Sequence, residues 1–272
     1  MNFFKNIVFL SQLTTNNIKA YFKSKEPVAS DPIYTNSVNW YGHATTVINL
    51  SDVIILTDPV LSTYLGHFFK RLVDKPYLLE EKRFDYILLS HGHMDHMDFP
   101  SLRKLDKTAT IIVPKGYKRL MRIFGFKKII VLRHDEVYED DKIKITSIKA
   151  DHDGRRYYMG IDDESHSYLI ERNDKKVFFA GDTVYTEKFS SLECDVALMP
   201  VGCYKPDRFA SMHCTPEESY RMFKMMDCPA MIPIHYKTFK ISLENFDDTT
   251  NILKNFEDET LKIINIGETY KL

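Results

Sequence analysis

Three histidines and two aspartates are packed into the eight residues from His91 to Asp98, directly after the apolar run Phe84–Ser90. Imidazole and carboxylate groups are the ligands that zinc, manganese and iron take in proteins. Crowded imidazolium ions would repel one another, so such a cluster needs either a metal ion or a wide solvated surface. The apolar run beside the cluster disfavours a solvated surface. The sequence therefore predicts a metal site at the end of a buried strand.

Other polar residues stand at the ends of further apolar runs. His152 follows the run KITSIKA after one intervening residue, Asp182 follows VFFAG, and His235 follows AMIPI. Sites on α/β sheets form at the ends of buried strands. Residues 91–96 alone cannot close two coordination shells, so these three side chains are the candidates that would complete them.

Strand-like runs recur from Ser37 onward, first in hairpins and then alternating with helices, and this order occurs twice. The pattern predicts an α/β fold in which two mixed sheets pack face to face with helices outside, a four-layer αββα sandwich. The predicted strands are Val38–Tyr41, Thr45–Leu50, Val53–Thr57, Phe84–Ser90, Thr110–Pro114, Ile129–Leu132, Ile143–Ala150, Ser167–Arg172, Val177–Ala180, Asp195–Pro200 and Ala230–Ile234. The predicted helices are Pro100–Leu105, Tyr117–Phe124 and Pro216–Met226. Asp98 should cap the first of these helices, and Thr215 with Glu218 should form a capping box at the third.

The N-terminal segment is predicted to be an appendage to this sandwich. We expect residues 1–30 to form a helical extension and linker, and residues 31–272 to form a single domain. Apolar residues such as Ile7 and Ile18 fall near one helical face, with lysines elsewhere. Such a helix packs on its own domain or on a partner subunit of a homo-oligomer. The alternative is that residues 1–24 contact a membrane surface peripherally.

The charge balance limits the partners that the chain can bind. The 272 residues hold 37 Lys and Arg against 38 Asp and Glu, for a formal net charge of -1. That balance argues against a nucleic-acid partner bound through a broad basic face. The four cysteines form no C-x-x-C pair, no run of 18 apolar residues occurs, and the N-terminus lacks a signal-peptide pattern. We therefore expect a cytoplasmic protein, at most peripheral to a membrane.

The order of the candidate ligands is specific to one superfamily. The motifs H-x-H-x-D-H, a single His, G-D-T and a late P-x-H resemble the ligand set of the metallo-β-lactamase superfamily over residues 38–239. The resemblance implies the αββα fold, a hydrolase domain over residues 31–272 and two divalent metal ions per chain. One ion would be held by His91, His93 and His152, and the other by Asp95, His96 and His235, with Asp182 bridging the two.

Further motifs narrow the resemblance to one branch. Residues 40–45 (WYGHAT) and 57–59 (TDP) are similar to the branch that contains N-acyl phosphatidylethanolamine-hydrolysing phospholipase D and ascorbate-6-phosphate lactonase. Residues 200–206 and 213–218 resemble the phospholipase D side in particular. The resemblance therefore implies a metal-dependent phosphodiesterase. The alternatives are a lactonase acting on a phosphorylated sugar lactone and a membrane-associated binding protein with a structural metal site.

The expected metal is Zn²⁺, with Mn²⁺ or Fe²⁺ as alternatives. Two such ions lower the pKa of a shared water, which would then attack as a bridging hydroxide. With Asp95, Asp182 and the hydroxide counted, the site keeps one net positive charge, which suits a small anionic substrate or a phospholipid. We expect Asp95 to be catalytic as well as a ligand, because its carboxylate can orient the hydroxide.

The remaining histidines differ in what their sequence context indicates. His213 precedes the capping box of a predicted helix, and we expect it to be catalytic by donating a hydrogen bond to the substrate or a proton to the leaving group. His43 either lies by the metal ions or holds the first loop through a buried hydrogen bond. His67, His134 and His166 carry no spacing signal and are expected to be surface or structural residues.

Overall fold

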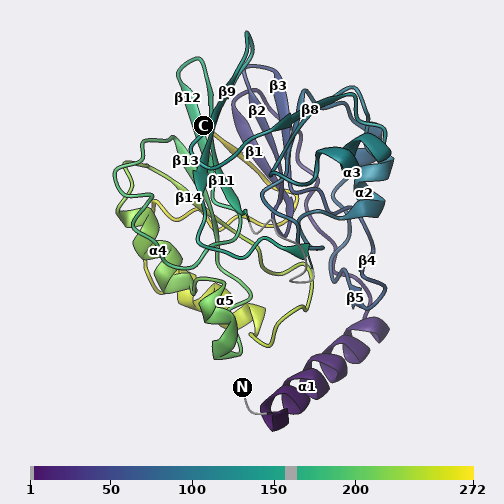
Figure 1. The fold of residues 1–272 in the computed structure, drawn as a ribbon. Helices are drawn as coiled ribbons and strands as arrows, with labels where there is room; N and C mark the ends of the chain where they lie inside the picture. Colours follow the sequence, from purple (N-terminus) through teal and green to yellow (C-terminus); the bar gives the residue numbers. More distant parts are fainter. Residues whose placement is uncertain (1–2, 157–163) are drawn as a thin grey trace.

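Two mixed β-sheets lie face to face with helices on their outer sides (Figure 1). This computed structural model describes residues 3–156 and 164–272. The first sheet has the strand order β15 (Thr269–Lys271), β1 (Ser37–Gly42), β2 (Thr45–Leu50), β3 (Val53–Thr57), β6 (Tyr86–Leu88), β7 (Thr110–Val113) and β8 (Lys128–Val131). The second has the order β14 (Met231–Ile234), β13 (Val196–Pro200), β12 (Lys175–Phe179), β11 (His166–Arg172), β10 (Lys144–Lys149) and β9 (Val137–Glu139). The predicted αββα sandwich is confirmed.

Each sheet is covered by its own helices. Leu102 of α2 (Phe99–Lys104) and Met121 of α3 (Lys118–Ile123) pack on the outer face of the first sheet. Phe223 of α4 (Pro216–Lys224) packs on the second sheet, and α5 (Phe246–Lys254) lies against α4 (Figure 1). The shorter elements are the hairpin of β4 (Tyr64–Leu65) and β5 (Phe69–Lys70), and the 3₁₀ helices η1 (Leu79–Glu81) and η3 (Asp207–Ser211).

The central strands β1, β2, β3 and β6 of the first sheet are buried on both faces, because successive side chains point into two different apolar layers. Trp40 and Ile55 point into the layer between the two sheets. Their neighbours Tyr41 and Leu56 point into the layer under α2 and α3. Burial on both sides explains why these strands appear in the sequence as nearly continuous apolar runs.

The local signals for caps and turns are also confirmed. The side chain of Asp98 accepts a hydrogen bond from the backbone of Ser101 and caps α2. Thr215 and Glu218 form the capping box of α4. Residues 51–52 connect β2 to β3 with φ angles of 46° and 66°, the left-handed conformation that a two-residue hairpin turn requires. The predicted elements therefore begin and end within a few residues of the observed ones.

Helix α1 (Phe3–Phe22) lies at the lower end of the molecule in Figure 1, with its C-terminal end beside the hairpin of β4 and β5. Phe9, Leu13 and Ala20 are buried against the body of the protein. Asn17 Nδ2 donates a hydrogen bond to the backbone oxygen of Lys240 at 2.9 Å. The helix is therefore attached to its own domain along one face.

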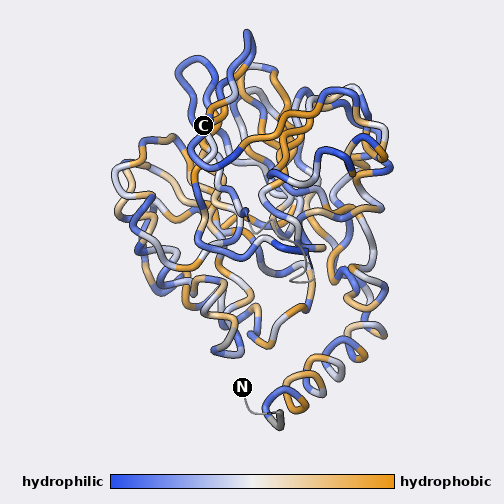
Figure 2. Tube along the Cα trace, in the orientation of Figure 1, coloured by the Kyte–Doolittle hydropathy of each residue, from blue (hydrophilic) through white to orange (hydrophobic). Residues whose placement is uncertain are grey.

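The opposite face of α1 is apolar and exposed. Figure 2 shows hydrophobic stretches along the helix, and the exposed side chains are Ile7, Val8, Leu10, Ile18, Tyr21 and Phe22. The segment predicted as a linker is hydrogen-bonded to the body, through the backbone of Glu26, Ala29 and Asp31. Within the described parts of the chain, no helix has both the length and the apolar character needed to cross a bilayer.

Candidate metal centre

The topology brings the predicted residues to one end of the sandwich. Strands β1, β3 and β6 run in the same direction in the first sheet, and so do β10, β12 and β14 in the second. Their carboxyl ends therefore meet at two facing sheet edges. The loops there carry His43 after β1, His91, His93, Asp95 and His96 after β6, His152 after β10, Asp182 after β12, His235 after β14, and His213 before α4.

A first cluster consists of His91, His93, His152 and Asp182. One ligand atom from each lies within 4.8 Å of the others. His152 Nε2 stands 3.2 Å from His93 Nδ1, and Asp182 Oδ2 stands 3.9 Å from His91 Nε2 and 4.0 Å from His152 Nε2. The four groups thus converge on one point between the loops after β6, β10 and β12.

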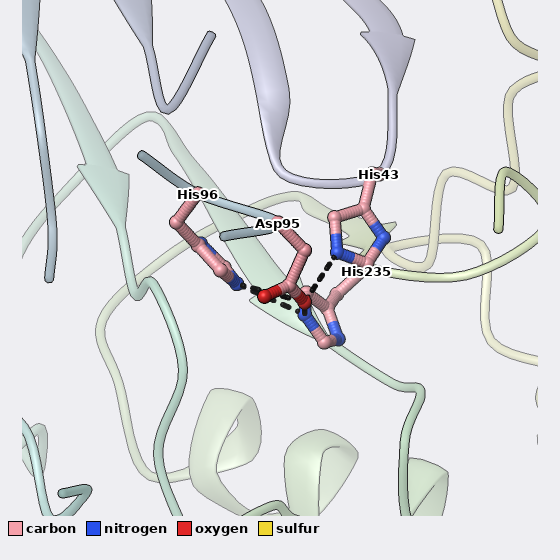
Figure 3. Close-up of side chains that lie close together, drawn as sticks. All are labelled: His43, Asp95, His96 and His235. Atoms are coloured by element: carbon pink, nitrogen blue, oxygen red, sulfur yellow. Dashed lines mark hydrogen bonds and ion pairs between the residues drawn. The ribbon is translucent and has the colours of Figure 1, made fainter. Parts of the chain in front are cut away.

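A second cluster consists of His43, Asp95, His96 and His235, whose side chains point toward one another (Figure 3). His43 Nε2 lies 3.0 Å from Asp95 Oδ2, and the Nε2 atoms of His96 and His235 lie 3.1 Å apart. Asp182 reaches this cluster too. Its Oδ1 is 3.1 Å from His235 Nε2, and its Oδ2 is 3.1 Å from His96 Nε2. Asp182 therefore stands between the two clusters, where a bridging ligand would stand.

The donor atoms of both clusters fit metal ions. Among the residues that the structure describes, His91 Nε2 and both carboxylate oxygens of Asp182 are buried without a hydrogen-bond partner of ordinary geometry. A buried polar group left unpaired costs about 1–3 kcal/mol. Imidazole nitrogens and carboxylate oxygens are suitable ligands for Zn²⁺, Mn²⁺ and Fe²⁺, so bound ions would satisfy these atoms together.

Hydrogen bonds behind the histidines fix which ring nitrogen faces the centre. The contacts are Asp58 Oδ2 to His96 Nδ1 at 2.7 Å, Ser90 Oγ to His91 Nδ1 at 2.9 Å, and the Met212 backbone oxygen to His152 Nδ1 at 2.7 Å. In each ring this leaves Nε2 directed at the centre. Such outer partners set the tautomer and orientation of metal-binding histidines.

Asp58 has a role here that sequence reasoning missed. Its Oδ1 accepts a hydrogen bond from the backbone of Ser90 at 2.7 Å, and its Oδ2 accepts one from Ser90 Oγ at 2.5 Å. One buried carboxylate therefore positions His96 directly and His91 through Ser90. The sequence indicated Asp58 only as the middle residue of a TDP turn, and an aspartate before a proline is an ordinary turn signal.

The electrostatics favour ionised carboxylates beside histidines that are neutral, with His96 as the exception. Burial raises the pKa of Asp182, but His235 and His96 outweigh it and hold that pKa well below its usual range. Burial and neighbouring imidazoles lower the pKa of His93 to about 4 and that of His91 well below its ordinary value. At His96 burial lowers the pKa, but the carboxylates of Asp182, Asp95 and Asp58 together outweigh it and raise the pKa well above its ordinary value, so an ion bound there would displace a proton.

A cavity of about 200 Å³ opens onto the centre. It is lined by His93, Met94, Asp95, Cys203, Phe209, Met212, His213 and Ile241. His213 Nδ1 lies 3.5 Å from Asp182 Oδ2, and the His213 ring stacks on that of His235 with centroids 5.6 Å apart. Burial lowers the pKa of His213 well below its ordinary value, so the ring is neutral at pH 7. The structure thus places His213 beside the clusters and His43 within the second one.

Comparison with known proteins identifies the family. A family model described as the beta-lactamase superfamily domain matches residues 54–236, the stretch that holds the ligand loops from His91 to His235. The chain belongs to this superfamily. One similar protein, of Enterococcus faecalis, carries the name metal-dependent hydrolase; it is 28% identical over 230 residues, with 75% of this chain and 88% of that protein covered.

The individual relatives of this chain are distant in sequence. The chain is 26% identical over 238 residues to an uncharacterized protein of Mycobacterium tuberculosis, with 79% of this chain and 64% of that protein covered. The match therefore spans less than two thirds of the mycobacterial protein. It is 26% identical over 285 residues to N-acyl-phosphatidylethanolamine-hydrolyzing phospholipase D 1 of Caenorhabditis elegans, with 90% of this chain and 79% of that protein covered.

The fold is also found among solved structures. A possible metal-dependent hydrolase from Veillonella parvula superposes with a TM-score of 0.73 at 19% identity, covering 88% of this chain and 100% of that one. The superposition supports the metallo-β-lactamase fold that the ligand motifs predicted. It carries no information about the substrate.

Proposed function

We propose that this chain is a dinuclear metal-dependent phosphodiesterase whose substrate is a phospholipid, with an N-acylated phosphatidylethanolamine as the first candidate. The observation that carries the proposal is the apolar wall beside the two clusters. Met94, Phe209, Met212 and Ile241 line the cavity next to His213. A lactonase for a phosphorylated sugar would need a compact polar pocket, whereas an acyl chain needs apolar side chains of this kind.

The two clusters would each hold one divalent ion, His91, His93 and His152 on one side and Asp95, His96 and His235 on the other, with Asp182 between them. When bound, such ions supply positive charge to phosphate oxygens and bring the pKa of water close to neutrality. Two divalent ions bring four positive charges against the carboxylates of Asp95 and Asp182. The centre would therefore be net positive and would favour an anionic phosphodiester over an uncharged ester.

The side chains around the ions would position the reacting groups. Asp95 is held by His43 at 3.0 Å, which fixes its carboxylate for orienting the attacking water. The neutral ring of His213 borders the cavity and would donate a hydrogen bond to a substrate oxygen. Its low pKa favours this role over that of a proton donor to the leaving group.

Helix α1 offers a route by which the substrate would reach the cavity. The ring of Phe9 contacts that of Phe209 at 5.4 Å, so α1 is attached directly to the cavity wall. On its other face, Tyr21 and Phe22 are 57% and 82% exposed. We propose that this face, within residues 1–24, contacts the membrane surface peripherally.

The decisive experiment measures hydrolysis of bis-p-nitrophenyl phosphate by protein whose metal content has been assayed. The Asp182→Ala variant should lose the activity, and Asp174→Ala, in the exposed β11–β12 turn, should retain it. Turnover of N-acyl phosphatidylethanolamine by the wild-type protein is then expected. No phosphodiester turnover by protein carrying two ions per chain would refute the proposal, and turnover of a phosphorylated lactone in its place would establish the lactonase.

Membrane contact is tested by sedimentation with phosphatidylserine-containing vesicles. Serine substitutions at Tyr21 and Phe22 should abolish co-sedimentation, and Gln12→Ala on the same helix should not. A wild-type protein that stays in the supernatant would refute the contact, and a dimer broken by the same serine substitutions would assign this face to a second copy of the chain.

A further inference from the structure

Outside the candidate metal centre, a second group of ligand-type side chains lies where the edges of the two sheets meet. His134 is in the connection from β8, at the edge of the first sheet, to β9, at the edge of the second. His166 begins β11, and Glu164 precedes it by two residues. One ligand atom from each of these three residues lies within 4.8 Å of the others. No sequence pattern indicated this group, because its first and second members are 30 residues apart.

The atoms that face one another in this group lack other partners. His134 Nε2, Glu164 Oε2 and His166 Nε2 are all buried and, within the described ranges of the chain, make no hydrogen bond. The side chain of His166 is fully buried, and its other nitrogen, Nδ1, is 2.5 Å from Ser147 Oγ. Three orphaned polar atoms that converge are unusual, since buried polar groups are almost always satisfied.

The Ser147 contact fixes how His166 presents its ring. A hydrogen bond at Nδ1 leaves Nε2 aimed at Glu164 and His134, as an outer partner does for a metal ligand. The distance from His166 Nε2 to Glu164 Oε2 is 3.4 Å. Two ligands of one tetrahedral zinc ion are separated by about 3.3 Å, given metal–ligand distances of about 2.05 Å.

An ion pair between His166 and Glu164 is the competing explanation of this distance, and the surroundings oppose it. A buried ion pair would be held by a hydrogen bond, but His166 Nε2 and Glu164 Oε2, 3.4 Å apart, make none with each other. The rings of His134 and His166 stand only 4.7 Å apart, and a proton on one would repel a proton on the other.

We propose that His134, Glu164 and His166 form a further metal site, for a divalent transition ion of the zinc class. Two imidazoles and one carboxylate match the preference of Zn²⁺, with water completing four ligands. The ion would tie the connection between the sheets to the start of β11.

The site would also support the neighbouring candidate metal centre. The backbone N–H of His166 donates to the Ser90 oxygen at 3.0 Å, and Ser90 precedes His91. A Cβ built on Gly154 would stand 2.3 Å from the backbone oxygen of Glu164 and 2.9 Å from His91 Cβ. Gly154 therefore lies tightly between Glu164 and the loop that carries His91.

Equilibrium dialysis of the metal-stripped protein against low-micromolar ZnCl₂ tests the site. His134→Ala and Glu164→Gln should each bind one zinc ion fewer per chain than the wild type. His67→Ala, which removes an exposed histidine elsewhere, should bind as many as the wild type. An active-site variant, Asp182→Ala, should still lose one further ion when Glu164→Gln is added, whatever the enzyme's substrate is.

Equal zinc stoichiometry in the wild type, His134→Ala and Glu164→Gln would overturn the proposal. Anomalous diffraction at the zinc edge from wild-type crystals gives a readout that does not depend on how the variants fold. A peak between the three ligand atoms is expected, and a peak confined to the clusters around Asp182 would refute the site.

Discussion

The most informative single substitution in the protein is Asp58→Asn, because it changes one atom of a residue that touches no substrate. The Asp58 carboxylate accepts three hydrogen bonds, two from Ser90 and one from His96. An asparagine side chain of the same shape has only one acceptor oxygen. Whichever way the amide is turned, its N–H group faces either the Ser90 backbone N–H or His96 Nδ1–H.

The Ser90 backbone N–H can only donate, so the amide oxygen is expected to face it and the amide NH₂ to face His96. The His96 ring would relieve the remaining conflict by moving its proton from Nδ1 to Nε2. Nε2 is the atom that lies 3.1 Å from both Asp182 and His235, so a proton there would block its use as a ligand. Loss of an outer partner of this kind typically costs 10–100-fold in metal affinity, which corresponds to about 1.4–2.7 kcal/mol. We expect a loss of this size for one of the two ions, the one held by the second cluster.

The assay is competition between metal-stripped protein and a chromophoric chelator for Zn²⁺, with thermal melting of the metal-stripped form as a check on folding. Asp85→Asn is the matched control, because the Asp85 carboxylate also accepts a backbone N–H, from Ile54 at 3.0 Å, but at the start of β6 away from the centre. If Asp58→Asn bound both ions as tightly as the wild type, the outer hydrogen bond would not orient His96 and our reasoning would be wrong.

Three further predictions follow from the same geometry. Burial, assisted by His235, lowers the pKa of His43 from 6.5 to about 4. Between pH 6.5 and pH 4 the unfolded metal-free chain therefore binds a proton at this residue that the folded chain does not bind. Urea titrations should show the free energy of unfolding falling as the pH is lowered toward 4, and falling less steeply in His43→Gln. Gly202→Ala would place a Cβ 2.0 Å from the His235 oxygen, so calorimetry should show a lower melting temperature and metal analysis a loss of bound ion. Phe209→Ala should raise KM for the lipid substrate more than KM for bis-p-nitrophenyl phosphate, and equal effects on both in steady-state kinetics would contradict the acyl-chain role of the cavity wall.

Much of the fold could be predicted because most strands are buried on both faces. Their apolar runs are nearly continuous, and local caps mark where α2 and α4 begin. Strands β9 and β15 were not predicted, because they are not buried on both faces. Both are short, lie at sheet edges and leave most of their residues partly or fully exposed, so that neither shows an apolar run or a clear alternation. Their pairing is decided by tertiary contact, which a local pattern does not contain.

The residues of the candidate site likewise fall into those that a local sequence pattern could predict and those that it could not. Residues 91–96 are contiguous, and His152, Asp182 and His235 each follow an apolar run, so spacing alone indicated them as ligand candidates. Asp58 could not be recognised, because its role depends on where the fold places His96. The group around His166 could not be found either, since His134 lies 30 residues before Glu164 and each member alone resembles an ordinary polar residue.

The last strand of the chain has a consequence for the order of folding during synthesis. β15 pairs with β1, and Asn39 donates a hydrogen bond to the Gly267 oxygen, 228 residues further along. At about 5–20 residues per second, a ribosome needs roughly 11–46 s to make the intervening chain. During that time β1, which leads into the His43 loop, has an open edge that another nascent chain could pair with. The first sheet is complete only after β15 has left the ribosome, so the open edge of β1 stays unprotected until then.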